Sequence, residues 1–152
     1  MGDRKRYYAA YGSNLDAVQM AARCPDARAV GTGAIEGYEL LFKGSKTGSY
    51  LTIEGAKGGS VPVGIWETSA DDEAALDIYE GFPTFYYKKD FAIPVTDEDG
   101  RVATRKCYAY VMHEDRPLGR PSPCYVETCL RGYEHFGFDP AILAEAIGRS
   151  CR

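Results

Sequence analysis

The sequence predicts an α+β fold with a barrel-like or strongly curved antiparallel or mixed sheet and with helices on the outside. Strand-like segments dominate the middle of the chain, where apolar and aromatic residues lie between glycines. Helix-like segments flank this region and interrupt it once. A strongly curved sheet with peripheral helices buries the apolar face of each element. The pattern does not determine the order of the strands in the sheet.

Length and charge narrow the class of protein. The 152 residues suit one domain spanning residues 1–152, which can bury about 68–70% of its unfolded surface. The formal net charge is −4 and the cations are scattered, so a nucleic-acid partner is not expected. No secretory-type apolar run follows the basic N-terminal segment, and no stretch approaches the ~20 apolar residues of a membrane span. We therefore expect no membrane partner and a cytoplasmic location, and the oligomeric state stays open.

Cysteine and histidine give no indication of a disulfide framework or a metal site. The cysteines number five and include no C-x-x-C pair, which favours free thiols in a reducing compartment. His113 and His135 have no ligand-like spacing. We expect neither a metal nor an organic cofactor.

The first elements are a strand and a helix joined by a tight turn. Residues 7–11 read as a short buried strand, and residues 15–22 read as a helix that Asn14 or Ser13 can cap and that Pro25 ends. Residues 31–44 then place four apolar side chains between glycines, as a strand would.

Glycine and capping residues predict the central elements. Residues 49–53 and 61–67 read as two strands joined by a glycine-rich connection. Ser69, with Asp72 three residues later, resembles a capping box for a helix over residues 71–79, which Gly81 ends in a left-handed conformation.

A hairpin and two helices complete the chain. Residues 85–95 and 101–112 read as strands flanking the turn sequence DEDG. Pro123 begins a helix over residues 123–135, and Asp139 caps a second helix over residues 140–148.

The turn Tyr11-Gly12-Ser13-Asn14-Leu15 is the first candidate for chemistry. A strand that ends on glycine before a helix directs unpaired backbone N–H groups, and the positive end of the helix dipole, toward one point. The turn lacks the lysine and the spaced glycines of phosphate loops, so a single carboxylate suits it better than a polyphosphate. An ordinary capped turn is the alternative.

Glu80 is the second candidate, because it stands at the C-terminal end of its predicted helix. The helix dipole disfavours a carboxylate there by up to ~1 kcal/mol. Together with the neighbouring aromatic residues Tyr79, Phe82 and Phe85, this should raise the affinity of Glu80 for its proton toward the range of a general base. The alternative is a solvated glutamate at a helix end.

Tyrosines are abundant, with 12 Tyr against 6 Phe. Their hydroxyl groups suit the lining of a polar pocket. Tyr87, seven residues after Glu80, and Tyr125 in PSPCYVETCL are the two that we expect near a site. For the others singled out, packing is the simpler interpretation: Tyr8, Tyr38, Tyr108 and Tyr110.

Taken together, YGSNL after an N-terminal strand, EG at the end of a central helix, a tyrosine seven residues beyond and PSPCY resemble the γ-glutamylcyclotransferase-like (AIG2-like/BtrG-like) superfamily over nearly the whole chain. The resemblance implies a small mixed β-barrel with peripheral helices and a cavity at one end. It also implies that residues 11–15 bind the α-carboxylate of a γ-glutamyl group, that Glu80 is the acid/base, and that Tyr87 and Tyr125 line the pocket.

The activity implied by this resemblance is intramolecular aminolysis of a small γ-glutamyl substrate, giving 5-oxoproline and a free amine. The YGSN form is similar to the branch that acts on γ-glutamyl amino acids, and γ-glutamylamines remain open as substrates. Two alternatives belong to other classes of function. One is a non-catalytic metabolite-binding domain of the same fold, and the other is an aromatic-rich barrel that binds single-stranded nucleic acid, which the acidic balance opposes.

Overall fold

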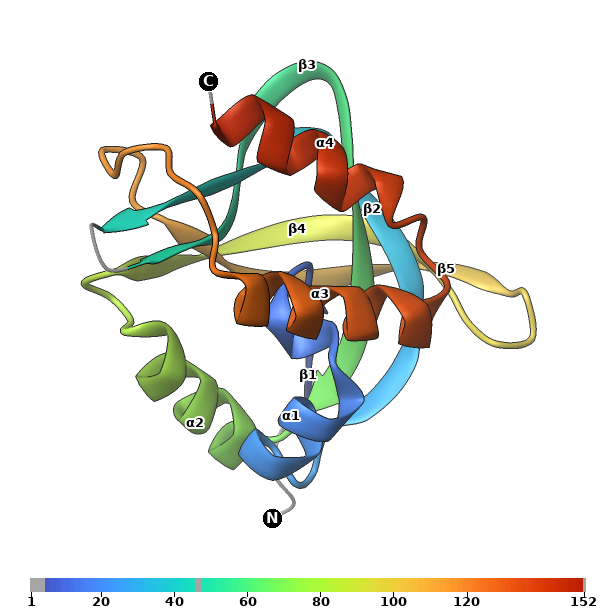
Figure 1. The fold of residues 1–152 in the computed structure, drawn as a ribbon. Helices are drawn as coiled ribbons and strands as arrows, with labels where there is room; N and C mark the ends of the chain where they lie inside the picture. The colour runs from blue at the N-terminus through green and yellow to red at the C-terminus, as the bar shows by residue number, and fades with distance from the viewer. Residues whose placement is uncertain (1–4, 46–47, 152) are drawn as a thin grey trace.

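A computed structural model of the protein describes residues 5–45 and 48–151 (Figure 1). Residues 1–4, which belong to the basic N-terminal segment discussed above, lie outside the described part. Within these residues, five strands form a closed barrel with helices around it, so the predicted fold class is confirmed. The elements in chain order are β1 (Arg6–Ala10), the 3₁₀ turn η1 (Ser13–Leu15), α1 (Ala17–Arg23), β2 (Arg28–Ser45), β3 (Gly48–Thr68), α2 (Ala70–Glu80), β4 (Tyr86–Thr96), β5 (Val102–Met112), α3 (Pro123–Phe136) and α4 (Ala141–Ser150).

The barrel is mixed because its first strand pairs differently on its two sides. The strand order is β1-β3-β2-β4-β5. β1 runs antiparallel to β3 and parallel to β5, where Tyr7 lies opposite Cys107. The other pairings are antiparallel. β1 therefore closes the barrel between β3 and β5, and its C-terminal end delivers the η1 turn to the barrel rim.

The prediction of two strands over residues 49–53 and 61–67 is wrong, because both belong to the single bent strand β3. Both halves pair with β2, and the register passes from Glu36↔Ser60 to Tyr38↔Gly55 across an irregularity. Gly37 and Gly58 both have φ of +79° at this bend, a conformation that favours glycine. The glycine-rich segment therefore bends the two strands together instead of reversing the chain.

Glycine also allows β2 to approach β4 closely. A Cβ atom on Gly31 would lie 2.3 Å from the carbonyl oxygen of Thr96, and one on Gly33 would lie 2.6 Å from Cγ2 of Ile93. No real Cβ tolerates such distances, so these two positions require glycine for the barrel to close here.

The helix boundaries follow local signals. Ser69 and Asp72 form the predicted capping box at the start of α2, and Gly81 ends that helix with φ of +64°. Ser122 caps α3, which begins at Pro123 as expected. The N-cap of α4 is Pro140 rather than the predicted Asp139, whose carboxylate nevertheless accepts a hydrogen bond from the Ala141 amide at 2.9 Å.

The start of the first helix differs from the prediction. Ser13, Asn14 and Leu15 form the η1 turn, and α1 begins only at Ala17. The side chain of Asp16 caps α1 by accepting from the Val18 amide, so neither Asn14 nor Ser13 is the cap. The amides of the turn, rather than the dipole of α1, are thus what this segment offers to a ligand.

Helix α3 supports the turn from behind. Leu15 is fully buried, and a Cβ on Gly132 of α3 would lie 2.3 Å from Cβ of Leu15 and 2.9 Å from the Asp16 amide nitrogen. The glycine thus lets α3 lie directly against the turn backbone. Among the described helices, none has both the length and the apolar character that a membrane crossing would require.

Candidate active site

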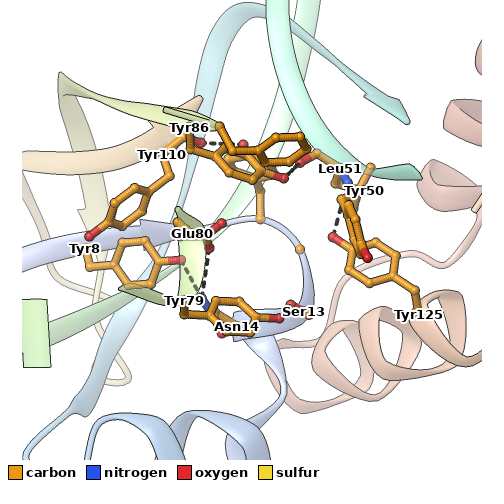
Figure 2. A pocket seen from close by; sticks show the side chains of 13 residues that line it. Tyr8, Ser13, Asn14, Tyr50, Leu51, Tyr79, Glu80, Tyr86, Tyr110 and Tyr125 are labelled. Atoms are coloured by element: carbon orange, nitrogen blue, oxygen red, sulfur yellow. Dashed lines mark hydrogen bonds between the residues drawn. The ribbon is translucent and has the colours of Figure 1, made fainter. Parts of the chain in front are cut away.

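A cavity of about 250 Å³ lies beside the η1 turn (Figure 2). Its volume is near the lower end of small-ligand sites. The described residues that line it include one carboxyl group, that of Glu80, and seven tyrosines. The lining residues are Tyr8, Tyr11, Gly12, Ser13, Asn14, Tyr50, Leu51, Tyr79, Glu80, Phe85, Tyr86, Tyr110 and Tyr125.

Glu80 is the last residue of α2, and its carboxyl group faces the cavity (Figure 2). The surrounding protein atoms remove most of its hydration, and this desolvation raises the pKa of Glu80 to about 8, against the opposing effect of the positively charged Arg23. The direction agrees with the sequence-based expectation. The main cause is burial, which places the group in the range where a carboxyl can exchange protons near neutral pH.

Asn14 connects the turn to Glu80. Its side-chain nitrogen donates to the hydroxyl of Tyr8 at 3.0 Å and, at 3.4 Å, to Oε1 of Glu80 (Figure 2). Its backbone carbonyl accepts from the indole of Trp66 at 3.0 Å. Asn14 and Glu80, which are 66 positions apart in the chain, are therefore held together at one end of the barrel.

The backbone of the turn leaves amides available for a ligand. Leu15 and Asp16 donate their N–H groups to the carbonyls of Gly12 and Ser13. Within the described part of the chain, no hydrogen bond is donated by the backbone N–H groups of Gly12, Ser13 or Asn14. Amides grouped in this way can bind an anionic oxygen.

The tyrosine hydroxyls around the cavity are held by specific partners. Tyr125 of α3 accepts from the Leu51 amide at 3.1 Å, and Tyr86 donates to the Leu51 carbonyl at 2.9 Å. Tyr110 donates to Oδ1 of Asp77 at 2.6 Å. Burial raises the pKa of each of these three phenols, so they stay neutral.

Six of the eight residues named from the sequence line this cavity: Tyr11, Gly12, Ser13, Asn14, Glu80 and Tyr125. Leu15 does not, because it points into the core beneath the turn. Tyr87 does not either, and its hydroxyl instead bonds Oε2 of Glu114 on the outside. Successive residues of a strand face opposite sides, so Tyr86 takes the cavity-facing position on β4.

Sequence reasoning missed several lining residues. Tyr8 and Tyr110 had been assigned to packing, whereas both also line the cavity, and Tyr50 and Leu51 had no assigned role. No local signal separates Tyr8 and Tyr110 from tyrosines that only pack, because the face of a strand that meets the cavity depends on the register of the sheet. Within the described residues, no cluster of three or more His, Cys, Asp or Glu side chains is placed to hold a metal ion.

Comparison with known families decides the relationship. The family model "gamma-glutamyl cyclotransferase, AIG2-like" matches residues 8–129, which include all the lining residues described above. The chain belongs to this gamma-glutamyl cyclotransferase family. A search of curated protein sequences finds no significant match.

Solved structures share the fold of this family member at low sequence identity. A structure described as a gamma-glutamyl cyclotransferase is 24% identical, with a TM-score of 0.79, and the match covers 94% of this chain and 86% of the other. A human protein described as uncharacterized gives the same identity and TM-score, over 93% and 86% of the two chains. A yeast gamma-glutamyl cyclotransferase described as specific to glutathione is 8% identical, with a TM-score of 0.64 over 96% of both chains. At these identities, the structural matches establish the fold.

Proposed function

We propose that the protein is a γ-glutamyl cyclotransferase that releases 5-oxoproline from a γ-glutamyl amino acid or a γ-glutamylamine. The observation that carries the proposal is the position of the Glu80 carboxyl group, which faces a small cavity and is hydrogen-bonded to Asn14 of the turn. Membership of the family supports the same class of reaction.

Binding of the glutamyl group is assigned to the turn. The backbone amides of Gly12, Ser13 and Asn14 would receive the α-carboxylate of the substrate, as their free N–H groups favour. Because the α-amino group is attached to the same carbon as that carboxylate, this contact would also place the nitrogen near Glu80. The turn would therefore affect the rate as well as the affinity.

Glu80 would serve as both base and acid. As a carboxylate it takes a proton from the substrate ammonium group, and the freed amine attacks the γ-carbonyl carbon. A C–N bond closes the five-membered ring, the original amide C–N bond breaks, and the departing amine takes the proton from Glu80. The ring nitrogen then loses its second proton to the released amine, which leaves as an ammonium ion. Proton transfer of this kind contributes typically ~10²–10⁴-fold in rate.

Holding the reacting atoms together contributes more than the proton transfer. An extended γ-glutamyl chain rarely brings its nitrogen and its carbonyl carbon into contact, and fixing them in contact can contribute ~7–11 kcal/mol. The cavity of about 250 Å³ is large enough to hold a glutamyl group against the turn and Glu80. The neutral hydroxyl of Tyr125 lines it, and because that hydroxyl accepts from the Leu51 amide it could donate its own proton to the developing oxyanion without adding charge.

The leaving amine would extend through the open side of the cavity. Tyr50 and Tyr79 mark that side, because both line the cavity and are 42% and 45% exposed. Phe85 also lines the cavity.

A substrate panel tests the proposal. The purified protein is incubated with γ-glutamyl amino acids, γ-glutamylamines and glutathione, and 5-oxoproline is measured by mass spectrometry. Formation of 5-oxoproline from at least one compound is expected, with none from α-glutamyl peptides, in which the ring cannot form by the same attack. Tight binding of a γ-glutamyl compound without turnover would instead indicate the non-catalytic binding domain.

The dependence of kcat/KM on pH should report the raised pKa of Glu80. In the protein without substrate, the Glu80 carboxyl has a pKa of about 8, so below that pH it is protonated and cannot accept the substrate proton. We expect kcat/KM to fall as the pH is lowered through about 8, with the slope of one proton. The measurement is a series of initial rates from pH 5 to pH 9.5, with the substrate ammonium titrated separately. An acid limb centred near pH 4.5 would contradict the assignment.

A further inference from the structure

Arg23, the last residue of α1, contacts two parts of the site. Its guanidinium donates from Nη1 to the side-chain oxygen of Asn14, and its carbon Cζ lies 3.4 Å from the centre of the Tyr79 ring. Tyr79 precedes Glu80 on α2, and its hydroxyl lies 3.2 Å from Oγ of Ser13. The half-buried side chain of Arg23 therefore contacts the turn and stacks on Tyr79, which is next to Glu80 at the end of α2.

The contact with Arg23 fixes which way the Asn14 amide points. An asparagine amide has one accepting oxygen and one donating nitrogen, so its two ends cannot serve the same partner. Arg23 can only donate, and it occupies the oxygen. The nitrogen is thereby directed to Tyr8 and Glu80. The reversed amide would direct an oxygen at Glu80 in its carboxylate form, the form that acts as the base, and would leave the guanidinium without its acceptor.

We propose that Arg23 is a positioning residue of this site, which holds the Asn14 amide in the orientation that donates to Glu80. This inference rests on the proposed function for its kinetic consequence, while the hydrogen-bond arrangement stands without it. Arg23 does not line the cavity, so it acts through Asn14 and Tyr79 rather than on the substrate.

The charge of Arg23 also affects the pKa of the Glu80 carboxyl, and few other charged groups lie near enough to do the same. The titratable groups around Glu80 are mostly phenols: Tyr8 and Tyr11 at the end of β1, Tyr86 on β4, Tyr110 on β5, Tyr125 on α3 and Tyr79 on α2. Burial raises the pKa values of the first five, so they remain neutral.

The other charges on this side of α2 are held in ion pairs. Lys88 of β4 pairs with Asp77 at 3.0 Å and with Glu73 at 2.7 Å, Glu73 also pairs with Arg6, and Asp77 accepts from Tyr110. Arg23 is the charge that opposes the desolvation of Glu80 and lowers its pKa. Loss of Arg23 should therefore make the carboxylate harder to form.

Substitution of Arg23 separates orientation from charge. Arg23→Met removes the positive charge and the hydrogen bond to Asn14. Arg23→Lys keeps the charge but lacks the planar guanidinium, which can stack on Tyr79 and donate to Asn14 at the same time. We expect kcat/KM at pH 7 to fall about ten- to a hundredfold in Arg23→Met, since a charge-assisted hydrogen bond is lost. The acid limb of kcat/KM should move to higher pH. Arg28→Gln, which removes an exposed arginine from β2, is the charge-matched control and should leave both unchanged.

Direct titration makes the test independent of turnover. The carboxyl carbon of Glu80, labelled with ¹³C and assigned by its absence in Glu80→Gln, is followed by NMR without substrate. The midpoint should rise in Arg23→Met, should stay near the wild-type value in Arg23→Lys, and should not change in Arg28→Gln.

Two results would overturn the proposal. One is an unchanged midpoint and an unchanged kcat/KM in Arg23→Met, and the other is an Arg23→Lys variant with wild-type kcat/KM, which would show that the planar contact has no role. If the wild-type protein formed no 5-oxoproline from any compound of the panel, the proposed function would fail, and the titration would still report whether Arg23 controls Glu80.

Discussion

Replacing Glu80 with glutamine is expected to reduce kcat by ~10²–10⁴-fold, because the only carboxyl group among the described lining residues is lost. Glutamine has nearly the same shape and can still accept the hydrogen bond from Asn14 through its side-chain oxygen. Binding of the γ-glutamyl group should therefore persist while proton transfer stops. The measurement pairs single-turnover formation of 5-oxoproline with calorimetric binding of a γ-glutamyl compound. Full turnover in this variant would remove Glu80 as the base.

The stability of the same variant provides the control for folding. The pKa of Glu80 is higher in the folded chain, about 8, than its ordinary value of 4.5, so the folded state binds more protons between these two pH values. The stability that depends on Glu80 is therefore complete below about pH 4.5 and is lost as the pH rises through about 8. The Glu80→Gln variant has no titratable group at this position, so its stability does not fall in this way as the pH rises. Compared with the wild type, Glu80→Gln should gain in Tm as the pH increases from 5 to 9.

The second large effect is expected at Gly12. A Cβ atom there would lie 3.0 Å from the hydroxyl oxygen of Tyr125 and 3.6 Å from Cβ of Leu51. Valine adds two methyl groups beyond that Cβ, so it would displace the Tyr125 hydroxyl and fill the space beside the turn amides. We expect a loss of about a hundredfold or more in kcat/KM, in line with the cost of misplacing a substrate by about 1 Å. Initial rates over a range of substrate concentrations would separate KM from kcat.

A graded series and a matched control sharpen this test. Gly12→Ala should give an intermediate loss, because only the single Cβ contact must be relieved. Gly55→Val makes the same change at an exposed position of β3, where the new Cβ would meet only the Gly37 carbonyl at 4.0 Å, and it should leave kcat/KM unchanged. Unaltered KM and kcat in Gly12→Val would argue against a ligand site at the turn.

Local signals in the sequence were sufficient for some elements of the fold and insufficient for others. The ends of α2 could be predicted because the Ser69 capping box and Gly81 act within a few residues of each end. The bend of β3 could not, because a glycine-rich segment can either reverse a strand or bend it. The outcome depends on which partner pairs with the two halves, and that partner, β2, lies elsewhere in the chain.

The candidate site shows the same division. The η1 turn and Glu80 could be named from the sequence because glycine before a turn and a carboxyl at a helix end are locally unusual. Tyr86 could not be distinguished from Tyr87, since a shift of one residue in the strand exchanges the two faces. Arg23 carried no local signal, because its partners Asn14 and Tyr79 meet it only in the folded chain.

The placement of β1 between β3 and β5 has a consequence for how the protein acquires activity. β1 is synthesised first, but the barrel closes only when β5 pairs with it. Tyr125 of α3, which follows β5 in the chain, can line the cavity only after that. Pairings between segments far apart in the sequence slow folding, because the chain must close long loops before these contacts can stabilise it. A partly synthesised or partly unfolded chain therefore has no enclosed cavity, and turnover measured during refolding would report the completed barrel rather than any intermediate.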